Sequence, residues 1–152
     1  MSHRKKRLEK LIQHRVREVE NRLQKLAEAR MAEERARQVL MAEEQALERA
    51  RQERAEATSR LFDVKSLTLT NDWLVSCARR RDLAEREVLN ARRGLTEAQK
   101  QLIVAKGEQK KIELIAERIA TEERVRAERI EQRMTDEFAA QRVEAEKRRG
   151  EP

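Results

Sequence analysis

The residues that could do chemistry in this 152-residue chain are few and scattered. The two histidines, His3 and His14, are eleven positions apart, so on a helix they lie on different turns. The single cysteine, Cys77, lies far from both in the sequence and cannot form an internal disulfide. No His/Cys metal site is expected from these three residues. Cys77 falls on an apolar row, which favours a small buried side chain over a nucleophile.

The other catalytic patterns are also missing from the sequence. The three glycines are dispersed, so no phosphate-binding loop is expected. Carboxylates are abundant, but they stand beside Arg or Lys at three- and four-residue spacing, as on a solvated helix surface. The sequence therefore predicts a protein that is not an enzyme, with no catalytic residues, no cofactor and no metal.

A basic cluster at the start of the chain is the strongest charged feature. Arg4, Lys5, Lys6 and Arg7 lie in a stretch, residues 1–30, that holds ten Lys or Arg and four acidic residues. Contact with an acidic protein surface, contact with nucleic-acid phosphates, and a solubilising terminus are the three interpretations, and Arg79–Arg81 forms a similar cluster. Stacking aromatics are missing and acidic residues are interleaved along most of the chain, so no nucleic-acid partner is predicted.

Trp73 is the only tryptophan, and it lies near the middle of the chain. It either packs on Leu61 or Leu69 to hold a chain reversal, or it anchors a partner, since Trp is enriched in binding hot spots. Phe62, Leu67 and Leu69 have the same two interpretations. Two helices alone offer too little surface to bury all of these apolar residues.

The composition predicts long helices. The chain is 43% charged and 2% aromatic, which is unusual for a layered globular core, and disorder is the first alternative. However, there are only three Gly and one Pro, and good helix formers dominate. No stretch approaches the roughly 18 apolar residues of a membrane helix, and no signal peptide is recognised. The lone cysteine suits a reducing compartment, so a cytoplasmic protein is predicted.

Two segments show the seven-residue repeat of a coiled coil. The first row is Ile12, Val19, Leu26, Leu40, Leu47 and Leu61, interrupted by Glu33 and Arg54. The second segment has a row of large residues beginning Leu74, Arg81, Val88, Leu95 and Leu102, and a row beginning Cys77, Ala84, Ala91, Ala98 and Ala105. The prediction is an all-α fold, in which two long helices form an antiparallel coiled-coil hairpin. One continuous helix in a parallel homodimer is the alternative.

The whole chain, 1–152, is predicted to be a single coiled-coil domain. Helix 1 is expected at about 4–62, the turn at about 63–71 and helix 2 at about 72–148, with Thr70, Asn71 or Asp72 as the helix cap. A turn centred near residue 67 would place Leu26 level with Ile112. Residues after about 134, including Phe138, would then have no partner within the hairpin.

Residues 130–142 resemble the end of the central stalk proteins of type III export. The segment reads Ile-Glu-Gln-Arg-Met-Thr-Asp-Glu-Phe-Ala-Ala-Gln-Arg, and its most specific part is Asp136, Glu137, Phe138 and Ala139. This is similar to the FliJ family of flagella and to its YscO-like relatives in injectisomes. The two-helix layout and the mid-chain Trp73 agree with the resemblance, which does not separate flagellar from injectisome systems.

The resemblance implies a non-enzymatic stalk with several partners. Members of the family bind and stimulate the hexameric export ATPase and contact the cytoplasmic ring of the export gate, and some bind export chaperones. Such a protein would lie at the cytoplasmic face of the inner membrane, held there only through its partners. The residues expected to bind the ATPase are Arg4, Lys5, Lys6, Arg7, Met134, Asp136, Glu137 and Phe138. Those expected to bind the gate are Trp73, Leu74 and Leu83. A generic structural coiled-coil scaffold is the alternative function, and a basic nucleic-acid-binding helical protein comes third.

Overall fold

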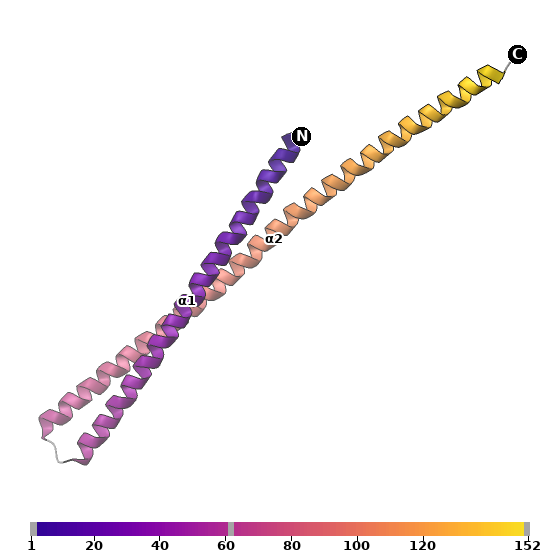
Figure 1. Ribbon diagram of the computed structural model, residues 1–152. Helices are drawn as coiled ribbons and strands as arrows, with labels where there is room; N and C mark the ends of the chain where they lie inside the picture. The colour runs from indigo at the N-terminus through magenta and orange to yellow at the C-terminus, as the bar shows by residue number, and fades with distance from the viewer. Residues whose placement is uncertain (1–2, 61–62, 151–152) are drawn as a thin grey trace. The chain divides into compact units, whose positions relative to one another are not determined.

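Two helices make up nearly all of the described chain. The computed structural model describes residues 3–60 and 63–150. Helix α1 spans His3–Ser59 and helix α2 spans Val64–Gly150, and the described residues contain no strand (Figure 1). The predicted all-α class with two long helices is confirmed. The alternative of one continuous helix is wrong, because α1 ends at Ser59 and α2 starts at Val64.

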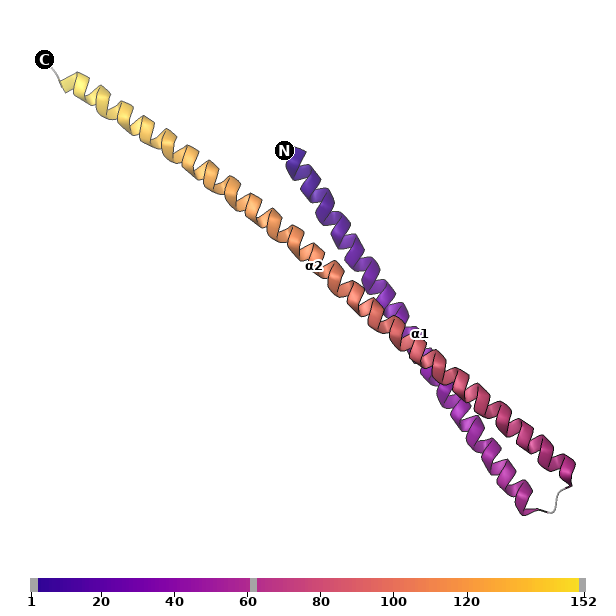
Figure 2. The same cartoon turned by 180° about the vertical axis from the view of Figure 1, so that it is seen from behind.

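The chain divides into two units, which are described separately. The hairpin unit is Val16–Lys106, and the terminal unit is Met1–Arg15 with Gly107–Pro152. Within the hairpin unit, the later part of α1 and the first part of α2 lie side by side and run in opposite directions (Figures 1 and 2). The prediction of a single domain over residues 1–152 stays a prediction.

The heptad rows form the core of the hairpin unit. One buried cluster joins Val19 and Leu26 of α1 to Leu102 and Ala105 of α2. A second cluster joins Leu47 and Ala50 to Cys77, which is completely buried. Alanine and cysteine on one row let the two helices approach closely, because their side chains are short. Apolar burial of this kind is the main force that holds two such helices together.

The turn lies earlier than the sequence predicted. Helix α2 begins at Val64 and not near residue 72, so the predicted turn at 63–71 is mostly helix. The Oδ1 atom of Asp63 accepts a hydrogen bond of 3.0 Å from the backbone N–H of Ser66, which makes Asp63 the cap in place of Thr70, Asn71 or Asp72. Hydrogen bonds from the backbone N–H and hydroxyl of Ser66 also hold the pKa of Asp63 below its ordinary value of 3.8.

The hydroxyl residues that suggested a turn are accommodated inside the helix. The Thr68 hydroxyl donates to the carbonyl of Val64 at 2.8 Å, and the Thr70 hydroxyl donates to the carbonyl of Ser66 at 2.9 Å. Such bonds to the carbonyl four residues earlier satisfy the hydroxyl without interrupting the helix. Leu61 and Phe62, which also entered the turn prediction, lie outside the described residues.

The earlier turn shifts the pairing of the two helices. Leu26 lies in a cluster with Leu102, not at the level of Ile112 as predicted. Polar contacts across the seam agree with this register: Arg22 Nη1 donates to Gln101 Oε1 at 2.6 Å, and Arg92 Nε lies 3.6 Å from Glu33 Oε1. The predicted register was wrong by about ten residues because it depended on a turn centred near residue 67.

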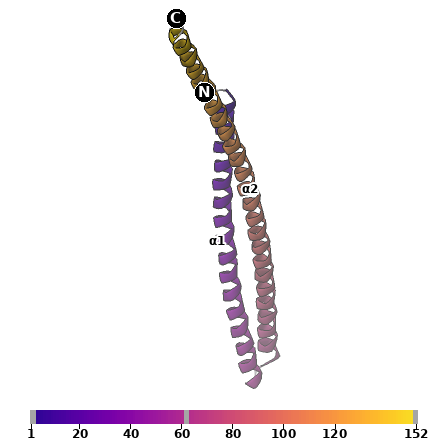
Figure 3. The ribbon, with the colours of Figure 1, turned by 90° about the vertical axis from the view of Figure 1, so that its right-hand side faces the viewer.

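The terminal unit is held together more loosely than the hairpin unit. Lys5 Nζ lies 2.7 Å from Glu123 Oε2, and Arg15 Nη2 lies 3.9 Å from Glu108 Oε2. None of the described residues of this unit is fully buried, and every residue from 126 to 150 is exposed. Helix α2 runs on past the start of α1 (Figure 3). The predicted unpartnered end of helix 2 therefore exists, but it begins near residue 126 rather than 134.

Candidate functional site

Trp73 presents an exposed ring on the first part of α2. Its side chain is 46% exposed, and the guanidinium carbon of Arg80 lies 5.4 Å from the ring centroid. A cation over an aromatic face is stabilised by the ring electrons, and this contact holds the ring in place at the surface. Leu69, one of the two predicted packing partners of Trp73, is 69% exposed. An exposed and oriented tryptophan has the properties of a partner-binding anchor.

The other two residues predicted to contact the gate differ from each other. Leu83 is 59% exposed and lines a shallow hollow with Arg79, Asp82 and Arg86. Leu74, in contrast, is half-buried and packs against the cluster of Leu47, Ala50 and Cys77. One side of Leu74 also lines an open groove, together with Arg51, Arg54, Ala55, Thr58 and Ser59 of α1. Leu74 therefore contributes first to the core of the hairpin unit.

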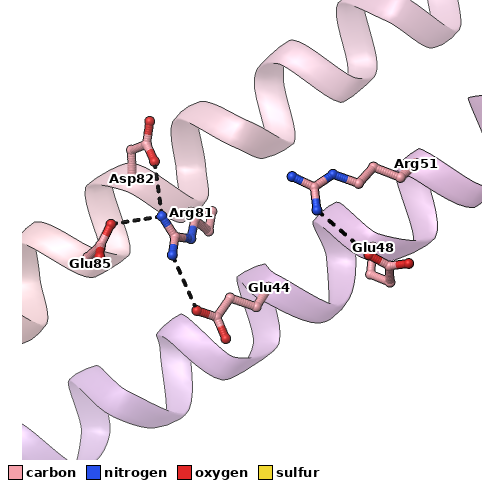
Figure 4. Close-up of polar contacts among 6 residues, drawn as sticks. All are labelled: Glu44, Glu48, Arg51, Arg81, Asp82 and Glu85. Atoms are coloured by element: carbon pink, nitrogen blue, oxygen red, sulfur yellow. Dashed lines mark hydrogen bonds and ion pairs between the residues drawn. The ribbon is translucent and has the colours of Figure 1, made fainter.

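The basic run Arg79–Arg81 is not a uniform patch of free cations. Arg81 lies 2.8 Å from Glu85, 3.5 Å from Asp82 and 3.7 Å from Glu44 across the seam (Figure 4). Arg80 is engaged with Trp73. Of the three, only Arg79 has no ion pair or ring contact to another described residue. This distribution is that of a helix surface with local ion pairs, and it offers little to a nucleic-acid backbone.

Glu33 is a charged residue on the apolar row of α1. Glu33 is 9% exposed, and its Oε1 atom lies 3.1 Å from Arg37 Nε and 3.6 Å from Arg92 Nε. Both arginine side chains are more than half exposed, so water reaches them as well. The carboxylate is therefore paired on both sides, and its function is structural.

The basic residues at the start of α1 are all exposed. Arg4, Lys5, Lys6 and Arg7 lie in the first two turns, and Lys5 is paired with Glu123. The hydrogen bond to Glu123, and then the charge of that carboxylate, raise the pKa of Lys5 above its ordinary value. The structure does not bring this cluster against Met134–Phe138. Met134 lies eleven residues beyond Glu123, roughly 16 Å along the helix.

An apolar stripe follows on the unpartnered part of α2. Ile130, Met134 and Phe138 are 58%, 66% and 68% exposed, and their spacing of four residues places them on one side of the helix. Glu137 borders this stripe, whereas Asp136 lies two residues from Phe138 and therefore about 200° around the helix from it. Ile130 was not among the predicted binding residues, although its spacing from Met134 could have revealed it.

No metal-binding arrangement is found among residues 3–60 and 63–150. In that part of the chain, no three His, Cys, Asp or Glu residues gather closely enough to hold a metal ion. His3 and His14 are exposed, and Cys77 is completely buried against Leu47 and Ala50. None of the described helices is long and apolar enough to cross a membrane.

The fold is a helical hairpin of the coiled-coil class. It consists of two long antiparallel helices that carry exposed apolar side chains and surface ion pairs. Residues 4–148 match the sequence model of the family described as Flagellar FliJ protein, so the chain belongs to the FliJ family. Members of this family are structural and adaptor proteins of the flagellar export apparatus and not enzymes. The resemblance inferred from residues 130–142 is thereby confirmed. No curated protein and no solved structure matches the chain.

Proposed function

We propose that this protein is a non-enzymatic stalk that binds and stimulates the hexameric export ATPase and links it to the cytoplasmic ring of the export gate. Membership of the FliJ family indicates that the protein associates with the flagellar export apparatus. Direct binding to the ATPase, binding to the gate ring and contact with export chaperones are proposals for this chain. A location at the cytoplasmic face of the inner membrane, through these partners only, follows from the same proposal.

The observation that carries the ATPase part is the unpartnered end of α2. Residues 126–150 are all exposed and helical, and they extend over about 37 Å at 1.5 Å per residue. Ile130, Met134 and Phe138 form an apolar row there with no partner among the described residues. Exposed apolar rows on an otherwise highly charged helix are typical of interaction sites. A helix with this row suits the central opening of a ring, since side chains are available on every face.

The gate part of the proposal is supported by the hairpin unit. Trp73 and Leu83 are the large exposed apolar side chains among the predicted gate residues, and Arg80 holds the Trp73 ring in place. Leu74 is better described as a residue that positions Trp73, because it is packed into the core one residue away. We therefore assign direct contact to Trp73 and Leu83 and a supporting function to Leu74.

A pair of truncations tests the ATPase part. A chain ending after Arg129 lacks Met134 and Phe138, and a chain ending after Arg142 keeps both. The first is expected to lose stimulation of ATP hydrolysis and promotion of the hexamer, measured by co-elution with the ATPase. The second is expected to keep most of both. Undiminished stimulation by the chain that ends after Arg129 would contradict the proposal.

A further inference from the structure

The first four turns of α1 contact α2 through exposed ion pairs and through apolar side chains that are only half-buried. Two ion pairs between residues 3–15 and α2 are Lys5–Glu123 and Arg15–Glu108, at 2.7 and 3.9 Å. Leu8 and Ile12 are only half-buried, and no described residue of this stretch is fully buried. The hairpin unit, in contrast, contains Val19, Leu26 and Leu102 in a buried cluster.

The basic residues of this stretch also destabilise the N-terminal end of α1. Helix α1 has no acidic residue in its first turn, and it begins His3, Arg4, Lys5, Lys6, Arg7. Positive side chains at a helix N-terminus are unfavourable, because the N–H groups there already carry a partial positive charge. The carboxylate of Glu123 offsets part of this charge through Lys5. Removing that carboxylate would weaken the compensation of the basic turn.

An apolar surface of α2 lies beneath this stretch. Ile112, Ala116 and Ile119 lie between the two ion pairs, on the same side of α2 as Glu108 and Glu123, and they are half-buried. The same row of α2 continues through the charged residues Glu123 and Arg126 to Ile130 and Met134, which are exposed. This side of α2 therefore carries two apolar patches, separated by Glu123 and Arg126. Residues 3–15 of α1 cover the patch at Ile112–Ile119, and the patch at Ile130–Phe138 is exposed.

We infer that residues 3–15 of α1 form a detachable arm, and that its release uncovers Ile112–Ile119 and adds a second apolar patch to the docking surface of α2. An acidic surface next to an apolar one can drive the release, because it competes with Glu123 for Lys5 and the neighbouring cations. The identity of that surface as part of the export ATPase depends on the proposed function. The release itself does not, since it follows from contacts within the terminal unit.

Amide hydrogen exchange on the full chain measures the release directly. Residues 8–15 are expected to exchange at least about 100-fold faster than residues 19–50, and nearly as fast as the unpartnered residues 126–150. Raising the salt concentration from about 0.05 to 0.5 M shortens the screening length from roughly 14 to 4 Å. This change should speed exchange in residues 8–15 several-fold and leave the buried clusters of the hairpin unit unchanged. Protection of residues 8–15 equal to that of residues 19–50 would overturn the inference.

A disulfide lock provides the matched control. The double variant Lys5→Cys and Glu123→Cys places thiols at the two positions joined by the 2.7 Å ion pair, whereas Lys6→Cys with Glu123→Cys displaces one of them around the helix. Oxidation of the first variant should slow exchange in residues 8–15 by at least tenfold, and reduction should reverse this. If oxidation forms the bond but leaves exchange unchanged, the arm is already closed in the native protein and the inference is wrong.

The same locked variant separates this inference from the proposed function. If the ATPase binds the row of α2, oxidation should weaken binding by about tenfold, with recovery on reduction. Binding that is equal in both states would mean that the uncovered residues 112–119 are not used, which overturns the docking part. Failure of the ATPase to bind in either state would contradict the proposed function, and the exchange experiment would still decide whether the arm detaches.

Discussion

Replacement of Glu33 by leucine is expected to stabilise the hairpin unit. Glu33 occupies an apolar row between Leu26 and Leu40, and the residue is 9% exposed. Burying a leucine at this position contributes about 1.5–3 kcal/mol. The loss of the two contacts to Arg37 and Arg92 costs less, about 0–1 kcal/mol each, because both arginines are more than half exposed and can be hydrated again.

The balance is a gain of about 1 kcal/mol for Glu33→Leu. Urea unfolding followed by circular dichroism measures it, and with a slope of about 2 kcal/mol per M the midpoint should rise by roughly 0.5 M. The neighbouring variant Glu34→Leu is the matched control, since the Glu34 side chain is 59% exposed, and it should leave the midpoint nearly unchanged. A midpoint for Glu33→Leu below that of the unmodified chain would refute this reasoning. In that case the Glu33–Arg92 ion pair would hold the two helices together more strongly than a buried leucine does.

Three further predictions follow from other contacts. Asp63→Ala should lower the thermal stability of the hairpin, because the cap of α2 is lost. The pKa of Asp63 in the folded chain lies below 3.8, so the stabilisation by its carboxylate is present above pH 3.8 and is lost as the pH falls through the folded-state pKa. The stability of the Asp63→Asn variant should therefore fall less in acid than that of the unmodified chain. Leu102→Ala should lower the free energy of unfolding in urea by about 2–3 kcal/mol, and Ile103→Ala by less than about 0.5 kcal/mol, because Leu102 is 8% and Ile103 is 69% exposed. Equal losses of stability in the two variants would contradict the described register. Trp73→Ala should reduce the amount of the chain captured by the gate ring at least tenfold, while Leu89→Ala, with a similarly exposed side chain, should not. If the two variants are captured equally well, Trp73 is not part of the proposed contact.

The heptad rows were sufficient to predict the helices and their antiparallel arrangement. Leu26, Leu47 and Cys77 are buried as their rows predicted. This succeeded because a seven-residue repeat leaves few ways to bury an apolar row when the chain contains almost no helix-breaking residues.

The position of the turn could not be obtained in the same way. Thr68 and Thr70 favour a turn by composition, yet their hydroxyls bond to carbonyls of the preceding helical turn. Asp63 competes as a cap with Asp72, and only the structure shows which carboxylate receives a backbone N–H. The register, and with it the start of the unpartnered end, depended on that choice.

The sequence was sufficient to predict which residues are candidates for binding, but not which other residues they contact. The exposure of Met134 and Phe138 follows from the length difference between the helices, which the sequence already indicated. In contrast, Leu74 is packed in the core and Lys5 is paired with Glu123, and both facts depend on contacts between distant parts of the chain. A resemblance to a family indicates such residues without describing their partners.

The most direct test of the account is the affinity of the export ATPase for two single variants of the unpartnered helix. Phe138 is 68% exposed, and Lys147 is an exposed residue nine positions further along α2, on the opposite side of the helix. Removing a central aromatic anchor from an interface costs about 2 kcal/mol, or roughly 30-fold in the dissociation constant. We expect a loss of this size for Phe138→Ala and less than a threefold change for Lys147→Ala, measured by titration of the ATPase. Equal affinities of both variants and the unmodified chain would contradict it.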